Sequence, residues 1–207
     1  MKKLFIILIL FSAMINTSSA QQTLQHKQED RFYIGYEVGL PSGFISKTSW
    51  RGGRLEYRHK LKPDLSFGVS MAWNSFEEYV NRNTYQKPDG TGALTTDMVK
   101  SVYVLPLTAT IHKYIKPGKR ALPWIGIGLG AQYNDETVYA NIYGVNDYNW
   151  GFVARPEIGA DFPLNDFTAL YLSATYNYAT NSFDAFNTSD HLNHFAISIG
   201  FSFGGGY

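Results

Sequence analysis

Few residues of this chain have the types and spacing that chemistry requires, and each set has a simpler explanation. His191 and His194 stand three positions apart, as two ligands of one metal ion would, but no third ligand is evident nearby. Gly126, Gly128 and Gly130 suggest a nucleotide-binding loop, but they alternate with apolar residues as in a strand, and no helix pattern follows. We therefore predict no metal and no cofactor.

Catalysis in a membrane setting has a recognisable requirement. A barrel that hydrolyses lipid esters needs a serine beside a histidine on its lipid face. Neither His59 nor His112 has a serine two positions further on, and His59 stands alone on its side of the segment. The sequence therefore predicts no catalytic residue and no enzyme.

Charged residues of both signs share one side of three segments. Charges withdrawn from water must be paired, because an isolated buried charge is very costly. A balanced set predicts a hydrogen-bonded network that plugs an interior, whereas an ion filter uses a ring of like charges. The network that we predict consists of Glu37, Arg54, Glu56, Arg58, Lys60, Arg155, Glu157 and Asp161.

Strict alternation of side chains determines which elements must position this network. The clearest run is 195–203, where large apolar residues alternate with Ala, Ser and Gly. A strand points successive side chains to opposite faces, so each such run predicts a two-faced strand. Similar runs predict eight strands in all, at 32–40, 52–61, 65–74, 103–111, 125–133, 152–162, 170–178 and 195–203.

The links between these runs alternate in length. Short links with turn chemistry lie at 62–64, 116–119 and 163–166. The links that we predict as long loops cover 41–51, 75–100, 134–150 and 179–192. Short turns at one end and long loops at the other are typical of membrane β-barrels. The fold class predicted is all-β, a closed antiparallel up-and-down transmembrane β-barrel. Pro106 and Pro156 fall inside strands, and we expect a bulge at each.

Volume decides which face of the barrel points outward. Roughly five large apolar side chains per strand would overfill the lumen of an eight-stranded barrel, whereas the small and polar set fits. The apolar face is therefore predicted to meet lipid. Aromatic residues fall near the two ends of the strands, as in the girdles at membrane–water interfaces. The predicted girdles are Trp73, Tyr103, Tyr133, Phe152, Tyr176 and Phe195 at one rim, and Phe32, Phe162, Phe201 and Phe203 at the other.

The beginning of the chain has the features of an export signal. Lys2 and Lys3 precede an apolar run that is too short to span a membrane, and Ser18-Ser19-Ala20 follows. We predict a signal peptide at 1–20, a flexible periplasmic lead-in at 21–31 and a barrel domain at 32–207. The chain has no cysteine and a formal net charge of +1, so neither disulfides nor nucleic acid are expected.

Together, the export signal, the eight strands, the 105–107 segment Leu-Pro-Leu and the glycines of 126–130 resemble the outer-membrane β-barrel proteins ("porin family") of Bacteroidetes-type bacteria, related in shape to the OmpX, OmpW and OmpA barrels. The resemblance implies a Gram-negative outer membrane, contact with its lipid, and insertion by the barrel-insertion machinery. That machinery would read a terminal aromatic residue, which is either Phe203 or Tyr207.

Function is less determined than fold. Our leading hypothesis is a plugged barrel with a structural or adhesive role, acting through extracellular loops whose ligand is a sugar or a protein. Five loop tyrosines would bind such a ligand, and the equal alternative is that they belong to ordinary surface loops; they are Tyr79, Tyr85, Tyr139, Tyr143 and Tyr148. One alternative is an OmpW-like channel for small or hydrophobic solutes, with a pocket lined by Val104, Val153 and Tyr171. Another is a soluble exported lipid-binding barrel.

Overall fold

Strands make up nearly all of the structure, a computed structural model that describes residues 30–43, 45–86, 92–115, 121–140, 143–183 and 190–205. The strands are β1 (Asp30–Ser42), β2 (Ser49–Lys62), β3 (Leu65–Gln86), β4 (Ala93–Tyr114), β5 (Leu122–Ala140), β6 (Tyr143–Pro163), β7 (Thr168–Ala179), β8 (Ser182–Phe183), β9 (Asp190–His191) and β10 (Asn193–Gly204). No helix among these residues is long and apolar enough to cross a membrane.

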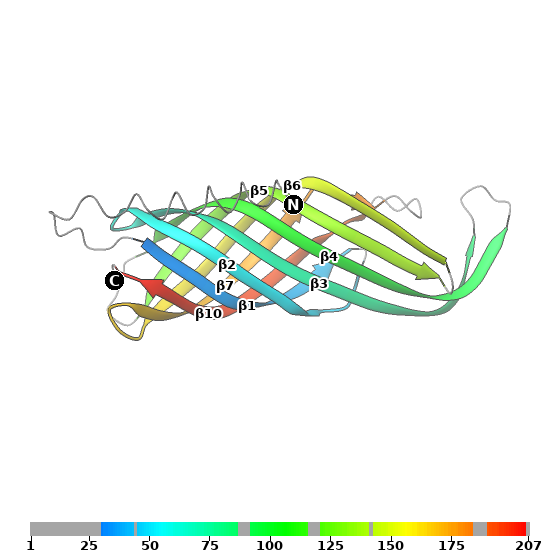
Figure 1. Cartoon of the computed structure of the whole chain (residues 1–207), viewed down its shortest axis with the longest axis horizontal. Coiled ribbons are helices and arrows are strands. Elements are labelled where there is room, and N and C mark those ends of the chain that lie inside the picture. The colour runs from blue at the N-terminus through cyan, green and yellow to red at the C-terminus, as the bar shows by residue number, and fades with distance from the viewer. Residues whose placement is uncertain are drawn as a thin grey trace, which may run out of the picture.

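Eight of the strands close into a barrel in the order β1-β10-β7-β6-β5-β4-β3-β2 (Figure 1). Every pair is antiparallel, and β1 closes the ring by pairing with β10 along its whole length. The remaining two strands, β8 and β9, form a small separate sheet within the link between β7 and β10. The predicted closed up-and-down barrel of eight strands is confirmed.

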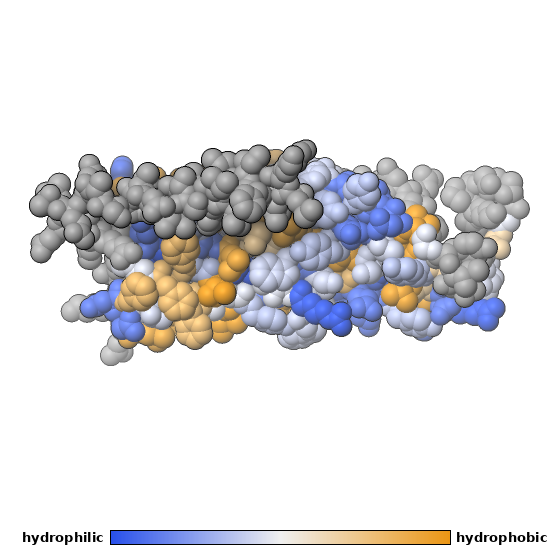
Figure 2. Space-filling model, viewed as in Figure 1, coloured by the Kyte–Doolittle hydropathy of each residue, from blue (hydrophilic) through white to orange (hydrophobic). Residues whose placement is uncertain are grey.

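Alternating side chains point out of the barrel and into it, as the sequence pattern predicts. On β1, Phe32 and Ile34 are 60% and 54% exposed, whereas Tyr33 between them and Glu37 further along the strand are buried. Figure 2 shows apolar side chains gathered on part of the visible wall, with hydrophilic side chains beyond them. The large apolar side chains thus lie on the outside, where a soluble lipid-binding barrel would not have them.

Two segments predicted as long loops, 75–100 and 134–150, are mostly strand. β3 and β4 stay paired as far as Gln86 and Ala93, and β5 and β6 pair up to Ala140 and Tyr143. Pairing of β4 with β5 continues to Met98 and Ala140. These strand ends form one four-stranded sheet beyond the barrel, which we call the protruding sheet (Figure 1).

The protruding sheet begins where the neighbouring strands stop. β2 pairs with β3 only as far as Asn74, and β7 pairs with β6 only up to Val153. The loop prediction was wrong because these residues are polar on the outer side, which hides a weaker alternation. Phe76, Val102 and Val138 on the inner side keep the period of a strand. We call this end of the molecule the hairpin end and the opposite end the turn end.

The bulges expected at Pro106 and Pro156 do not form. Pro106 keeps a continuous register with β5, and the pairing of β4 with β3 has the same register on either side of a short gap at the proline. Pro156 likewise keeps its register with β5, with a gap toward β7. Each proline therefore removes local pairing on one side without shifting the strand, since it only lacks a donor.

Several sequence predictions lie partly or wholly outside the described residues. The signal peptide at 1–20 and positions 21–29 of the lead-in are outside, as is Tyr207. The last two residues of the predicted lead-in, Asp30 and Arg31, belong to β1.

Candidate functional site

An ion-pair network fills the middle of the lumen. The Glu56 carboxylate accepts hydrogen bonds from Arg54 (2.7 Å), from Arg58 (2.9 Å, twice) and from the Thr110 hydroxyl (3.1 Å). Arg54 Nη2 also lies 2.6 Å from Glu157 Oε2. In the ring of strands, β2 and β6 are diametrically opposite. The Arg54–Glu157 pair therefore bridges the full width of the lumen.

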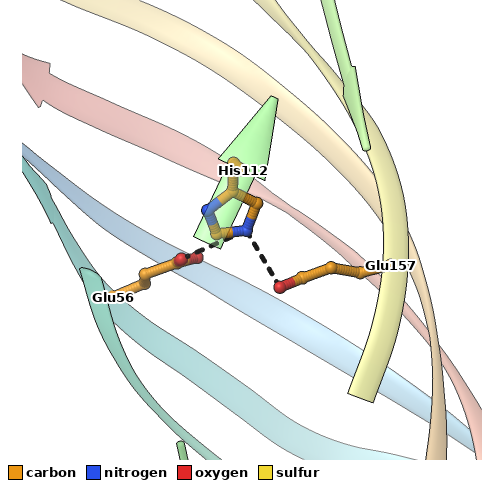
Figure 3. A group of neighbouring side chains, drawn as sticks. All are labelled: Glu56, His112 and Glu157. Atoms are coloured by element: carbon orange, nitrogen blue, oxygen red, sulfur yellow. Dashed lines mark hydrogen bonds and ion pairs between the residues drawn. The ribbon is translucent and has the colours of Figure 1, made fainter. Parts of the chain in front are cut away.

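His112 joins the same network from β4. Its Nε2 lies 2.9 Å from Glu157 Oε1 and 3.5 Å from Glu56 Oε1, and all three residues are buried (Figure 3). These side chains are the one group of potential metal ligands among the described residues. Both carboxylates, however, already bind arginine, and two guanidinium groups would repel a divalent cation. The donor set fits a charge network better than a metal centre.

A second set of contacts surrounds Glu37. Its carboxylate accepts hydrogen bonds from Asn74 Nδ2 (2.7 Å), Ser198 Oγ (2.8 Å) and Arg155 Nη2 (3.4 Å). These partners come from β3, β10 and β6. A single carboxylate thus ties three other strands together inside the barrel.

A third set, closer to the turn end, is aromatic. Asp161 accepts hydrogen bonds from the Tyr33 hydroxyl (2.7 Å) and from Trp124 Nε1 (3.1 Å). The Arg58 guanidinium lies 4.2 Å from the ring centre of each of these aromatics. Tyr114 adds a contact of 3.3 Å to the Tyr33 hydroxyl. Arg58 therefore links the aromatic layer to the ion-pair network.

The structure brings seven of the eight predicted charges into the buried interior. Lys60 is the exception, since it is only half-buried and its ammonium lies 5.6 Å from the Tyr114 ring centre. Three partners of these charges, His112, Tyr33 and Trp124, were not predicted from the sequence. Alternation alone already places His112 and Tyr33 on the inward face, so this signal was present.

An apolar cluster closes the interior at the hairpin end. Phe76, Val102 and Val104 are fully buried there, and Ile45 and Leu192 enter the cluster from links between strands. The complete cluster is Ile45, Phe76, Met98, Val102, Val104, Val138, Ala140 and Leu192. Val104, together with Val153 and Tyr171, was predicted to line a solute pocket, but all three are at most 1% exposed.

The outward side of the protruding sheet carries exposed tyrosines, and we call it the tyrosine face. The cross-strand registers place Val99 between Tyr79 and Tyr139, and Asp135 between Tyr103 and Tyr148. The tyrosines Tyr79, Tyr103, Tyr139 and Tyr148 are 58%, 38%, 52% and 69% exposed. Tyr85 and Tyr143 belong to β3 and β6, but their side chains are outside the described part of the structure.

Polar side chains hold the tyrosine face in place. The Tyr79 hydroxyl donates a hydrogen bond to Asp97 Oδ2 (3.1 Å). Asn146 Nδ2 donates to Asp135 Oδ1 and to Thr137 Oγ1, both at 2.8 Å. The face is therefore a hydrogen-bonded surface of a sheet, with flat rings and polar groups side by side.

Two carboxyl groups at the hairpin end have perturbed pKa values. Burial raises the pKa of Glu136 to about 7, and the charge of Asp147 acts in the same direction, against a hydrogen bond from Asn134. For Glu78, burial would raise the pKa, but hydrogen bonds from the Ser46 side chain and backbone outweigh it and lower the pKa.

The ten girdle residues all lie on outward-facing positions of their strands. Seven are at least 36% exposed, and Trp73, Tyr133 and Tyr176 are half-exposed. Ring pairs form at both rims, with centroids 4.7 Å apart for Tyr176 and Phe195 and 6.5 Å apart for Phe201 and Phe203.

Comparison with known proteins shows similarity in structure alone. No family model and no curated protein match the chain. Among solved structures, Neisserial surface protein A (NspA) matches with a TM-score of 0.57 and 15% identity, over 86% of this chain and 99% of that one. Ail, the attachment invasion locus protein of Yersinia pestis, matches with a TM-score of 0.52 and 15% identity, over 86% of this chain and 100% of that one. That structure was solved in complex with the heparin analogue sucrose octasulfate. A major outer membrane protein from Thermus thermophilus matches with a TM-score of 0.53 and 13% identity, over 84% of this chain and 99% of that one.

The chain has the fold of outer-membrane β-barrels. This finding confirms the predicted fold class and the resemblance to outer-membrane barrels. At these identities the likeness concerns the fold, so the role of this outer-membrane barrel must be argued from its own surfaces.

Proposed function

We propose that this chain is an outer-membrane barrel with a closed lumen that binds an extracellular ligand through the tyrosine face. The observation that carries the proposal is the exposure of Tyr79, Tyr139 and Tyr148 on a paired, hydrogen-bonded sheet. Tyrosine offers a large amphipathic contact area with few rotatable bonds, which suits a binding surface. The hairpin end would face outward if the short turns lie in the periplasm, as in other outer-membrane barrels.

The interior supports a role without transport. Arg54 and Glu157 meet across the lumen, and the aromatic layer and the apolar cluster lie on either side of them. A solute would have to displace paired charges that are out of contact with water, and breaking such pairs is strongly unfavourable. In planar bilayers we expect no large stable conductance step. Such steps would favour the alternative of a channel.

The chemistry of the tyrosine face restricts its ligand. Ail was solved with a heparin analogue, which is a polyanion. Here the face carries the carboxylates of Glu77, Asp97 and Asp135, and Glu77 lies 3.3 Å from Arg51. Carboxylates between the rings would repel a polyanion. We therefore favour an uncharged sugar or a protein as the ligand.

Adhesion of whole cells tests this proposal. A Gram-negative host that displays the barrel should adhere to ligand-coated surfaces, found by screening a glycan array and extracellular-matrix proteins. The double variant Tyr139→Ala/Tyr148→Ala should reduce adhesion at least tenfold, since aromatic anchors dominate such interfaces. Tyr178→Ala is the matched control, because Tyr178 is 49% exposed but lies on β7, outside the protruding sheet. Equal adhesion by the double variant and the control would refute the proposal.

A further inference from the structure

The outer wall of the barrel contains a groove next to a polar cluster at the turn end. The groove is open toward the outside of the barrel and has a volume of about 730 Å³, which is in the range of ligand sites. It crosses β1, β2, β3 and β4, and outward-facing apolar side chains form most of its wall. These outward-facing residues are Phe32, Ile34, Leu55, Tyr57, Val69, Met71 and Leu107.

The polar cluster consists of Asp30, Tyr57 and His59. Asp30 Oδ1 accepts a hydrogen bond from the Tyr57 hydroxyl at 2.7 Å and lies 2.7 Å from His59 Nδ1. The side chains of Asp30 and His59 are 42% and 46% exposed. Tyr57 belongs to both features, because its ring lines the groove and packs 5.1 Å from the ring of Phe32. The cluster and the groove are therefore continuous.

Its position sets the cluster at the membrane–water interface. Phe32 is part of the predicted girdle at the turn end, and Asp30 lies two residues before it on the same face of β1. Apolar side chains further from the turn end meet acyl chains, and polar groups at the level of Asp30 meet lipid headgroups. A carboxylate at headgroup level is complementary to a positively charged headgroup.

We propose that the groove and the cluster form a binding site for one phospholipid with a primary-amine headgroup, phosphatidylethanolamine. An acyl chain lies in the groove, and the ammonium group donates hydrogen bonds to Asp30. His59 uses Nδ1 for Asp30, so Nε2 is the ring nitrogen that remains to face the lipid phosphate. This site is independent of the tyrosine face and of any extracellular ligand.

Headgroup chemistry makes the proposal selective. Phosphatidylcholine carries a quaternary ammonium that cannot donate a hydrogen bond, and phosphatidylglycerol has no cation at all. Both share their acyl chains with phosphatidylethanolamine, so the groove alone would not distinguish the three lipids. A preference must therefore come from Asp30.

Native mass spectrometry of the purified barrel in detergent, with each lipid added in turn, tests the proposal. We expect one phosphatidylethanolamine to be retained with about tenfold higher affinity than either of the other lipids, the effect of hydrogen bonds to a charged group. Asp30→Asn should abolish the preference over phosphatidylcholine. Asp64→Asn, an exposed acid in the turn between β2 and β3, should leave it unchanged.

Filling the groove provides a second, separate readout. Val69→Phe should weaken binding of all three lipids, because Val69 lines the groove and is 55% exposed. Leu172→Phe is the control, since Leu172 lines a smaller concavity of about 570 Å³ elsewhere on the wall. Heat-modifiable gel mobility shows that each variant is folded. Equal retention of the three lipids by the unmodified barrel, or a preference that survives Asp30→Asn, would overturn the proposal.

Discussion

Replacing Glu56 by glutamine should destabilise the barrel more than any exposed charge substitution. Glu56 is 4% exposed and accepts hydrogen bonds from Arg54, Arg58 and Thr110. Glu56→Gln keeps the shape of the side chain but leaves two buried guanidinium groups beside a neutral amide. Removing one partner of a buried ion pair costs about 3–5 kcal/mol, and we expect a loss of about 3 kcal/mol because the amide oxygen still accepts one hydrogen bond.

Reversible urea unfolding in lipid vesicles, followed by tryptophan fluorescence and by heat-modifiable mobility, measures this loss. Glu77→Gln is the matched control, since Glu77 also pairs with an arginine at 3.3 Å, but at the surface, and should change stability by less than about 1 kcal/mol. The double variant Glu56→Gln/Arg58→Met removes one charge of each sign and should recover at least about 1 kcal/mol. Equal stability of Glu56→Gln and Glu77→Gln would refute the idea that paired charges hold the lumen closed.

Three further predictions concern the interior and the hairpin end. Burial raises the pKa of Glu136 to about 7, above its value of 4.5 in the unfolded chain. The stabilisation that this carboxyl group gives the folded barrel is therefore complete below pH 4.5 and is lost as the pH rises through 7. Glu136→Gln should flatten the pH dependence of urea unfolding between pH 4 and 9, a change of at most about 3 kcal/mol; a dependence equal to that of the unmodified chain would contradict this. Phe76→Ala should cost about 3–5 kcal/mol in the same unfolding assay, because Phe76 is fully buried in the apolar cluster, and a loss below about 1 kcal/mol would argue against that packing. Gly35→Val should prevent formation of the heat-modifiable barrel, because a Cβ there would lie 2.1 Å from the Tyr171 hydroxyl and 2.7 Å from a backbone carbonyl; a normally folded variant would show that the wall tolerates a side chain.

Alternation of side chains carried most of the fold prediction. It placed Ile199 outside and Glu37 inside, because a strand has only two faces and a one-residue slip would exchange them. The same reasoning failed at 75–86, where Glu77 and Tyr79 face water in place of lipid, so both faces look polar at first sight. Hydrophobic contrast identifies a strand only where one face meets an apolar medium.

Contacts across the lumen could not be predicted in the same way. The sequence placed Glu56 and Glu157 on the inner side, but their distance depends on the stagger of strands around the ring. Pro106 shows a related limit. The sequence reveals that this residue lacks a backbone N–H donor, but it does not reveal whether the strand forms a bulge there or a gap in its pairing. The position of His112 between the two glutamates follows from that same stagger.

Length gives the protruding sheet a further consequence. From Asn74 to Gln86, at about 3.3 Å per residue, β3 extends about 40 Å past its last pairing with β2. Cross-strand hydrogen bonds hold this extension along its length, so it is rigid and does not behave as a flexible loop. A target that binds the tyrosine face meets a rigid surface in place of a flexible loop, so binding costs less conformational freedom, which favours durable attachment.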